Sequence, residues 1–230
     1  MNQARLGVGL EGVGIADRAY QQALAYAQDR KQGRAIGAKG NGSDAIIVHP
    51  DVKRMLMQMR AMTAAARTIC YATAVALDVS VRATDAKVHY RDARITAIYE
   101  GTNGIQSIDL VTRKLGVNGG ASVWALLDEL SVIVKKVEAS NDPAFGSTGA
   151  KLRDALGSLE RSSRWLLERL GTAPNEALAG ATPYLRLFGS TLGGCMLAQE
   201  ALSARDLGEQ LGDARRYVTL ARFFAENVSV

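Results

Sequence analysis

Apolar side chains recur at spacings of three and four residues along most of this chain, and this pattern restricts it to helical folds. Only 4 prolines occur in 230 residues, so few positions would interrupt a helix. The sequence contains no convincing β-strand pattern and no internal repeat. It therefore predicts an all-α protein in which antiparallel helices, joined by short loops, form a bundle.

Turn and cap signals divide the helical pattern into segments. Residues 33–49 are rich in Gly, Asn and Ser and predict a loop, and Pro50 suits the first turn of the helix that follows. Four glycines in the early turns of the first helix suggest close packing against a neighbour. Residues 175–206 form either one long helix or two shorter ones. The expected helices are 3–31, 51–86, 103–115, 121–139, 147–170, 175–206 and 209–228.

Two positions break the regular pattern. The sequence Asn118-Gly119-Gly120 predicts a linker between two helical units, residues 1–117 and 118–230. Near residues 87–89, the polar stretch 82–87 runs straight into Val88-His89-Tyr90-Arg91 without any turn signal. That junction suggests a gap, where a segment is either deleted or absent from the chain as given.

Charge and hydropathy exclude several classes of protein. The net charge is +5, but Lys and Arg are scattered among Asp and Glu, so nucleic acid is not the expected partner. A basic balance suits phosphate-bearing substrates equally well. No apolar run approaches the roughly 18–20 residues of a membrane span, and the N-terminus lacks a signal segment. We therefore expect a cytoplasmic protein without a membrane span.

Cysteine and histidine give no sign of a metal or nucleophile site. Cys70 and Cys195 lie far apart in apolar, helix-like contexts and are expected to be buried free thiols. His49 and His89 are the only histidines, and neither has the spacing of a metal ligand to the other or to a cysteine. The Gly-containing loop 33–49 has the wrong spacing for a phosphate-binding loop, and no strand precedes it. We expect no metal.

One carboxylate stands out as a candidate for chemistry. Glu100 lies between an aromatic ring, Tyr99, and a glycine, Gly101, directly before a predicted helix. The glycine lets a ligand approach the backbone closely. Apolar neighbours such as Ile98 and Ile105 can exclude water from the acid, which raises its basicity. The residues therefore single out Glu100 as a candidate base, the alternative being a loop carboxylate that caps the helix at residue 103.

The whole run from Tyr90 to Gln106 resembles the catalytic-base segment of the acyl-CoA dehydrogenase family, where tyrosine, glutamate, glycine and threonine stand in the order of residues 99–102. Residues 1–117 are similar to the C-terminal helical domain of that family. Residues 121–230 resemble, more loosely, an extra helical domain that a subset of the family carries, in segments such as Tyr184–Gly189 and Ala221–Ala225.

This resemblance implies a reaction and a set of substrate contacts. The activity would be flavin-dependent α,β-dehydrogenation of an acyl-CoA thioester to trans-2-enoyl-CoA. Glu100 would remove the α-proton, while its own backbone N–H would help to hold the thioester carbonyl. Tyr99, Gly101 and Arg5 would contact the substrate, Arg5 from the opening of the first helix.

The resemblance also implies a cofactor and partners. FAD would be contacted by Thr102 and by Arg30, with Arg30 reaching the flavin of a neighbouring subunit. The protein would therefore be a homo-oligomer, a dimer or tetramer. Electron-transfer flavoprotein would accept the electrons, in the β-oxidation of fatty acids.

The chain also departs from the family pattern. No aromatic residue separates Gln32 from Gly33, and Gly104 stands where many members carry glutamine. The Gly-rich stretch that helps to hold the flavin is missing at residues 87–89. The family's N-terminal helical domain and middle β-domain are absent as well, so this chain looks like the C-terminal part of a longer enzyme. Alone, it is expected to bind no flavin stably and to turn over no substrate.

Two other hypotheses stay open at this point. The chain could be a catalytically silent helical scaffold that keeps the fold and lacks a flavin. It could also belong with relatives that bind DNA, because it is basic overall. Flavin absorbance separates the first of these from an enzyme, and a steep salt dependence of DNA affinity would support the second.

Overall fold

The computed structural model describes residues 2–35, 42–82, 103–207 and 214–229. Within these ranges the regular structure is helical, and the extended pairing is one isolated antiparallel bridge between Lys31 and Ala45. The prediction of an all-α fold is confirmed.

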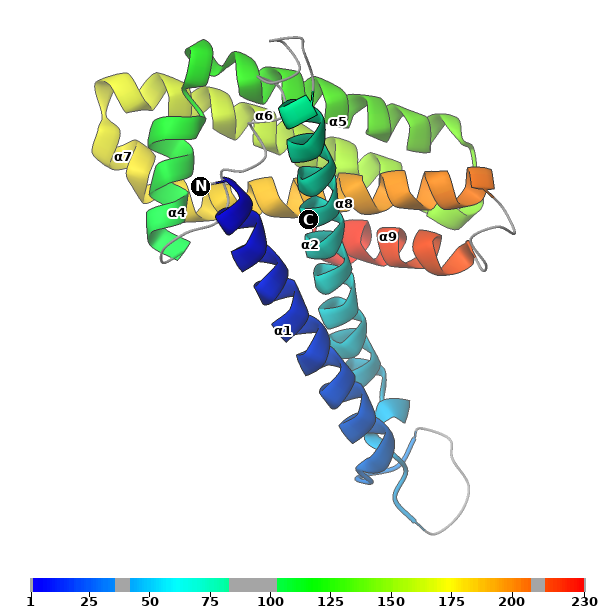
Figure 1. Ribbon diagram of the computed structural model, residues 1–230. Helices are drawn as coiled ribbons and strands as arrows, with labels where there is room; N and C mark the ends of the chain where they lie inside the picture. Colours follow the sequence, from blue (N-terminus) through cyan, green and yellow to red (C-terminus); the bar gives the residue numbers. More distant parts are fainter. Residues whose placement is uncertain (1, 36–41, 83–102, 208–213, 230) are drawn as a thin grey trace.

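The first two long helices form an antiparallel hairpin. Helix α1 (Asn2–Asp29) is followed by the short 3-10 helix η1 (Ile46–Val48) and by α2 (Pro50–Arg82). We call α1 and α2 together the arm. Figure 1 shows that α1 and the first turns of α2 project away from the rest of the molecule. Helix α1 packs mainly on α2 and η1, whereas α2 also packs on α8 and α9.

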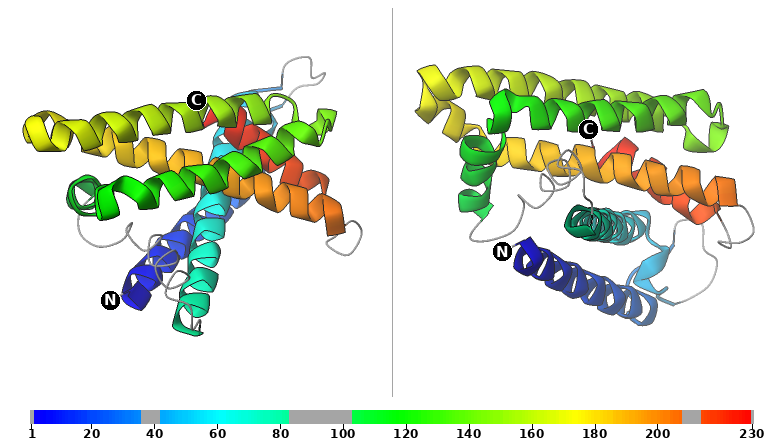
Figure 2. Two further views of the ribbon diagram at one scale, coloured as in Figure 1. Left: turned by 90° about the horizontal axis from the view of Figure 1, so that it is seen from above. Right: turned by 45° about the horizontal axis from the view of Figure 1, so that its top comes forward.

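The remaining helices form what we call the body, residues 103–229. Its short first helix α4 (Asn103–Asp109) continues into the π-helical segment η3 (Leu110–Lys114) and the 3-10 turn η4 (Val117–Gly120). Figure 2 shows three layers, in which α8 and α9 lie between the α5–α6 pair and the arm. The other elements of the body are α5 (Ala121–Ala139), η5 (Pro143–Phe145), α6 (Thr148–Thr172), α7 (Pro174–Ala179), α8 (Ala181–Leu207) and α9 (Arg215–Asn227).

The hydrophobic core lies where α5, α6, α8 and α9 meet. Its largest fully buried side chains are leucines of α5, α6 and α8, and the arm contributes Ala61 and Ala65 from α2. Burial of such side chains is the main source of stability in a helical bundle. The leucines are Leu130, Leu152, Leu159, Leu166 and Leu197.

The small-residue run of α8 permits close helix packing. A Cβ atom at Gly194 would lie 2.6 Å from Leu152 Cδ2, and one at Gly193 would lie 3.0 Å from the Cβ of Ala65. The glycines of α1 differ, because a Cβ at Gly12 or Gly14 would meet no atom within 4 Å. Within the described part of the chain, the prediction that the α1 glycines pack closely against a neighbour is therefore wrong for these positions.

The turns fall close to their predicted places. Residues 118–120 all have positive φ, of 50°, 65° and 86°, which reverses the chain direction before α5 begins at Ala121. The segment 175–206 is two helices, α7 and α8, which are separated at Gly180. The division of the chain into two domains at this linker stays a prediction, as does the gap near residues 87–89, which lies outside the described residues.

One described helical segment is apolar and long enough to cross a membrane. Residues Val117–Ala139 reach the required mean hydropathy of 1.2 in their most apolar window, and 33% of that window is buried. The prediction that no segment approaches a membrane span is wrong for these residues by length and composition. The apolar side of α5 packs on α6 and α8, while Asp128 and Glu129 lie on its exposed side, as in the core helix of a bundle.

Candidate active site

Of the six residues predicted to form the active site, the structure describes two. Arg30 is described with its side chain, whereas Arg5 lies in α1 with a side chain that is not described. The other four predicted site residues lie outside the described residues, and their roles stay predictions. These four are Tyr99, Glu100, Gly101 and Thr102.

The helix that follows the predicted base is present and anchored. Helix α4 begins at Asn103, three residues after Glu100, and runs into η3, as the predicted helix 103–115 requires. The hydroxyl of Ser107, which is buried, lies 2.8 Å from the carbonyl of Gly104 and 3.2 Å from Oγ1 of Thr182 on α8. The contact with Thr182 holds α4 against α8.

Ile105, which was expected to help exclude water from Glu100, has an exposed side chain. Its side chain is 59% exposed, and that of Ile108 one turn later is 42% exposed. In the described part of the chain, this face of α4 is therefore open to solvent. The role of Ile105 beside Glu100 stays a prediction, because Glu100 lies outside the described residues.

The best defined part of the predicted cofactor site is the corner where α1 ends. The carbonyl of Arg30 accepts a hydrogen bond from the N–H of Ile46 at 2.8 Å, and the N–H of Gln32 donates to Asp44 O at 3.0 Å. Asp44 in turn donates its N–H to Gly33 O at 2.9 Å. The backbone around Arg30 is thus fixed, while its side chain is exposed and has no ion-pair partner in the described ranges.

His49 packs against the corner at the point where the family pattern has an aromatic insertion. The imidazole Nε2 lies 2.9 Å from the carbonyl oxygen of Gln32. Gly33 has a φ of +69°, and a Cβ there would lie 3.4 Å from the same imidazole nitrogen. Gln32 and the directly following Gly33 therefore form a tight turn, and the His49 ring packs against that turn.

The structure does not bring Arg5 and Arg30 together. They lie at opposite ends of α1, so a rise of 1.5 Å per residue separates their backbones by about 37 Å. Arg5 lies close to the start of α1, near the point marked N in Figure 1, and Arg30 directly follows the other end of α1, at the tip of the arm. These two arginines cannot contact one and the same small ligand within a single chain.

The cysteines are structural. Cys70 and Cys195 are buried and form no disulfide, as predicted. Burial raises the pKa of the Cys195 thiol to about 12 and also raises that of Cys70. Both thiols therefore stay protonated near neutral pH, which makes them poor nucleophiles.

Comparison with protein families gives two matches. Residues 1–87 match the family described as "Acyl-CoA dehydrogenase, C-terminal domain". Residues 126–230 match the family described as "Acetyl-CoA dehydrogenase C-terminal like". The two matches lie on either side of residues 88–125, and the first ends at the junction where the sequence suggested a missing segment.

Curated relatives cover the whole of this chain. A 3-methylmercaptopropionyl-CoA dehydrogenase of Ruegeria pomeroyi is 32% identical over 279 positions, which include 100% of this chain and 47% of the relative. A butyryl-CoA dehydrogenase of Syntrophomonas wolfei is 27% identical, with 99% of this chain and 46% of the relative covered. A broad-specificity linear acyl-CoA dehydrogenase of Mycobacterium tuberculosis is 24% identical, with 99% and 47% covered.

These alignments carry two facts about length. The chain spans about half the length of the curated relatives it matches. The alignments extend over 279, 293 and 291 positions, more than the 230 residues of the chain, so each contains positions that no residue of this chain fills. The alignment lengths do not place these positions along the chain, so the gap near residues 87–89 stays a prediction.

Proposed function

This chain belongs to the acyl-CoA dehydrogenase family, and we propose that it supplies the C-terminal part of an enzyme that oxidises acyl-CoA thioesters to trans-2-enoyl-CoA. The observation that carries this proposal is the run of residues 90–106, with Glu100 between Tyr99 and Gly101, in a chain whose two halves match C-terminal domains of the family. The relatives named above support the same class of substrate, because two are named as dehydrogenases of a particular acyl-CoA and the third as a broad-specificity linear acyl-CoA dehydrogenase.

The chemistry assigned to Glu100 follows from the substrate. The α-hydrogen of a thioester is weakly acidic, so its removal needs a base placed next to the α-carbon in a site that excludes water. Negative charge then develops on the carbonyl oxygen and needs hydrogen-bond donors, of which the backbone N–H of Glu100 would be one. Tyr99, Gly101 and Arg5 would position the acyl-CoA beside the base.

The described residues suit a flavin cofactor at one place. Arg30 presents an exposed guanidinium without an ion-pair partner in the described ranges, on a backbone held by Ile46 and Gln32. Such a group suits the diphosphate of FAD, because a guanidinium binds phosphate oxygens in a forked geometry. Thr102 would be a second contact. When bound, FAD would supply the acceptor for the β-hydride.

The separation of Arg5 from Arg30 supports a homo-oligomer. A separation of about 37 Å along α1 lets each arginine serve a different active site, as it would if Arg30 reached the flavin of a neighbouring subunit. The arm also exposes large apolar side chains, including Ile15 at 73% and Val75 at 64%. Exposed apolar side chains gathered on one part of a molecule are typical of an interface. We propose a dimer or tetramer built through the arm.

The electron acceptor and the metabolic context are proposed from membership of the family. Electron-transfer flavoprotein is the proposed electron acceptor, and the β-oxidation of fatty acids is the proposed context. The proposed location is the cytoplasm.

The protein expressed from its complete reading frame tests this function. We expect the purified protein to show flavin absorbance, and we expect that absorbance to bleach anaerobically when butyryl-CoA or another acyl-CoA is added. The 230-residue chain alone is expected to bind FAD only weakly and to oxidise no acyl-CoA. A complete protein that lacks flavin, or whose flavin no acyl-CoA reduces, would contradict the proposal and favour a silent scaffold.

A further inference from the structure

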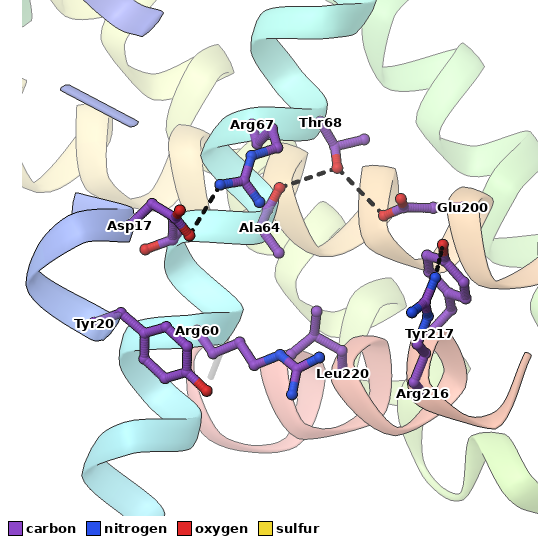
Figure 3. A pocket seen from close by; sticks show the side chains of 11 residues that line it. Asp17, Tyr20, Arg60, Ala64, Arg67, Thr68, Glu200, Arg216, Tyr217 and Leu220 are labelled. Carbon is purple, nitrogen blue, oxygen red and sulfur yellow. Dashed lines mark hydrogen bonds and ion pairs between the residues drawn. The ribbon is translucent and has the colours of Figure 1, made fainter. Parts of the chain in front are cut away.

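A polar groove lies where the arm crosses the body (Figure 3). Four helices contribute to its lining, which comprises side chains of α1, α2, α8 and α9, and its volume is about 390 Å³. It is separate from the Arg30 corner, which lies at the tip of the arm. The charged side chains and one tyrosine of the lining are Asp17, Tyr20, Arg60, Arg67, Glu200 and Arg216.

Helical spacing places two arginines on the same face of α2. Arg60 and Arg67 are seven residues apart, which is two turns of a helix, so their side chains emerge on one stripe. Between them, the short side chains of Thr63 and Ala64 line the groove. A third arginine, Arg216, enters from α9 on the other side.

The carboxylates of the groove are already engaged. Asp17 Oδ1 accepts an ion pair from Arg67 at 3.1 Å, and Asp17 Oδ2 accepts a hydrogen bond from the amide of Gln21 at 2.8 Å. Glu200 Oε2 lies 3.3 Å from the hydroxyl of Thr68. Among the residues that the structure describes, Arg60 and Arg216 therefore have no carboxylate partner of their own.

Arg60 is the cation that this arrangement leaves unused. Its side chain is exposed and, within the described part of the chain, has no ion-pair partner. Arg216 is oriented by its neighbour, because its guanidinium carbon lies 4.7 Å from the centroid of the Tyr217 ring and its Nη2 donates to the Tyr217 hydroxyl at 2.8 Å. Figure 3 shows Arg60 extending across the groove between Tyr20 and Leu220.

We propose that this groove binds a small phosphate-bearing molecule. The three guanidinium groups outnumber the two carboxylates, and arginine donates forked pairs of hydrogen bonds to phosphate oxygens. The phosphate binds Arg60 and Arg216, and the hydroxyl of Tyr20 supplies a further donor. The volume falls in the range of small-molecule sites, which run from roughly 300 to 1,000 Å³, so it holds more than the phosphate alone. This inference does not depend on the proposed dehydrogenase activity.

Calorimetric titration of the 230-residue chain with inorganic pyrophosphate at low ionic strength tests the proposal. We expect saturable binding with a dissociation constant below about 1 mM. Because a hydrogen bond to a charged group is strong, Arg60→Ala should weaken binding by at least about tenfold, and Arg60→Lys should weaken it less. Arg216→Ala should behave like Arg60→Ala.

A matched control variant distinguishes binding in the groove from general attraction of pyrophosphate to a basic protein. Arg161→Ala removes the same charge from an exposed position on α6, outside the groove, and should leave binding unchanged. Thermal unfolding followed by circular dichroism verifies that every variant is folded. The proposal is overturned if pyrophosphate shows no saturable binding, or if Arg161→Ala weakens binding as much as Arg60→Ala.

Discussion

The arm and the body contain helices of similar length, but they bury their side chains to very different extents. Helix α1 has 28 residues, and Val13 and Ala27 are its buried apolar side chains in the described part. Helix α8 has 27 residues and is buried along most of its length, from Ala181 to Ala204. The difference follows from neighbours, because α1 packs mainly on α2, whereas α8 packs on helices of the arm and the body.

This contrast shows what an amphipathic pattern does and does not determine. The spacing of apolar residues in α1 predicts a helix with an apolar face, and the helix is present. The pattern does not say what covers that face, and Leu10 and Ile15 remain 41% and 73% exposed. The arm therefore has apolar surface that this chain does not bury, in agreement with its proposed role as an interface.

The largest expected effect is a core truncation in the body. Leu159→Ala removes a side chain with 0% exposure, so we expect a loss of about 3–5 kcal/mol in the free energy of unfolding. The matched change in the arm is Ile15→Ala, which should alter that free energy by less than about 0.5 kcal/mol. Urea denaturation of the 230-residue chain measures both. Equal losses at the two positions would contradict the division into a packed body and an uncovered arm.

Glycine replacements sharpen the same comparison. Gly194→Ala places a methyl group 2.6 Å from Leu152 Cδ2 and 2.8 Å from Ser229 Oγ, so we expect it to destabilise the protein by about 1–3 kcal/mol. Gly12→Ala meets no atom within 4 Å and should stabilise α1 by roughly 0.5–1 kcal/mol, because alanine favours a helix. Opposite signs in the unfolding free energy are the expected outcome. Destabilisation by Gly12→Ala would indicate packing in the arm that the structure does not show.

The smallest expected effect concerns a polar contact between helices of the body. Glu226 on α9 accepts hydrogen bonds from the N–H and hydroxyl of Ser147 and pairs with Arg222. Burial raises the pKa of Glu226, but these contacts outweigh it and the pKa is lowered overall. Because the pKa of Glu226 is lower in the folded than in the unfolded protein, its ionised form stabilises the fold at pH values above the unfolded-state pKa, which is about 4.3. This stabilisation is lost as the pH falls through the folded-state pKa.

We therefore expect Glu226→Gln to destabilise the protein by about 1 kcal/mol at pH 7, and the difference from wild type to shrink toward pH 3. The control is Asp51→Asn in the arm, whose ion pair with Arg54 is 71% exposed on the carboxylate side and should matter little at either pH. Urea denaturation at several pH values gives both curves. If the difference in unfolding free energy between wild type and Glu226→Gln stays constant with pH, the ionised Glu226 carboxylate does not stabilise the fold.

Local patterns predicted the secondary structure well and the tertiary arrangement poorly. Helix α5 occupies the predicted residues 121–139, because its boundaries are set by Gly120 at one end and by the Asn141-Asp142-Pro143 break at the other. Burial of the two cysteines also followed from their apolar neighbours. Exposure of the arm did not, since it depends on which helices cover which faces.

The candidate sites show the same contrast between local sequence motifs and tertiary arrangement. Glu100 and Arg30 came from short motifs, and the structure adds the fixed backbone around Arg30. The arginine groove was missed, because Arg60 and Arg216 lie on helices that are far apart in the sequence and meet only in the folded chain. The seven-residue spacing of Arg60 and Arg67 was visible, but such spacing alone is common on exposed helix faces.

Anaerobic flavin bleaching by acyl-CoA, measured in the protein expressed from its complete reading frame, tests most directly whether Glu100 is the base. Glu100→Gln should keep the flavin and slow bleaching by about 10³-fold or more, since the amide cannot accept the α-proton. Glu168→Gln, an exposed change on α6, should bleach at the wild-type rate. Wild-type bleaching by the Glu100→Gln protein would contradict the account.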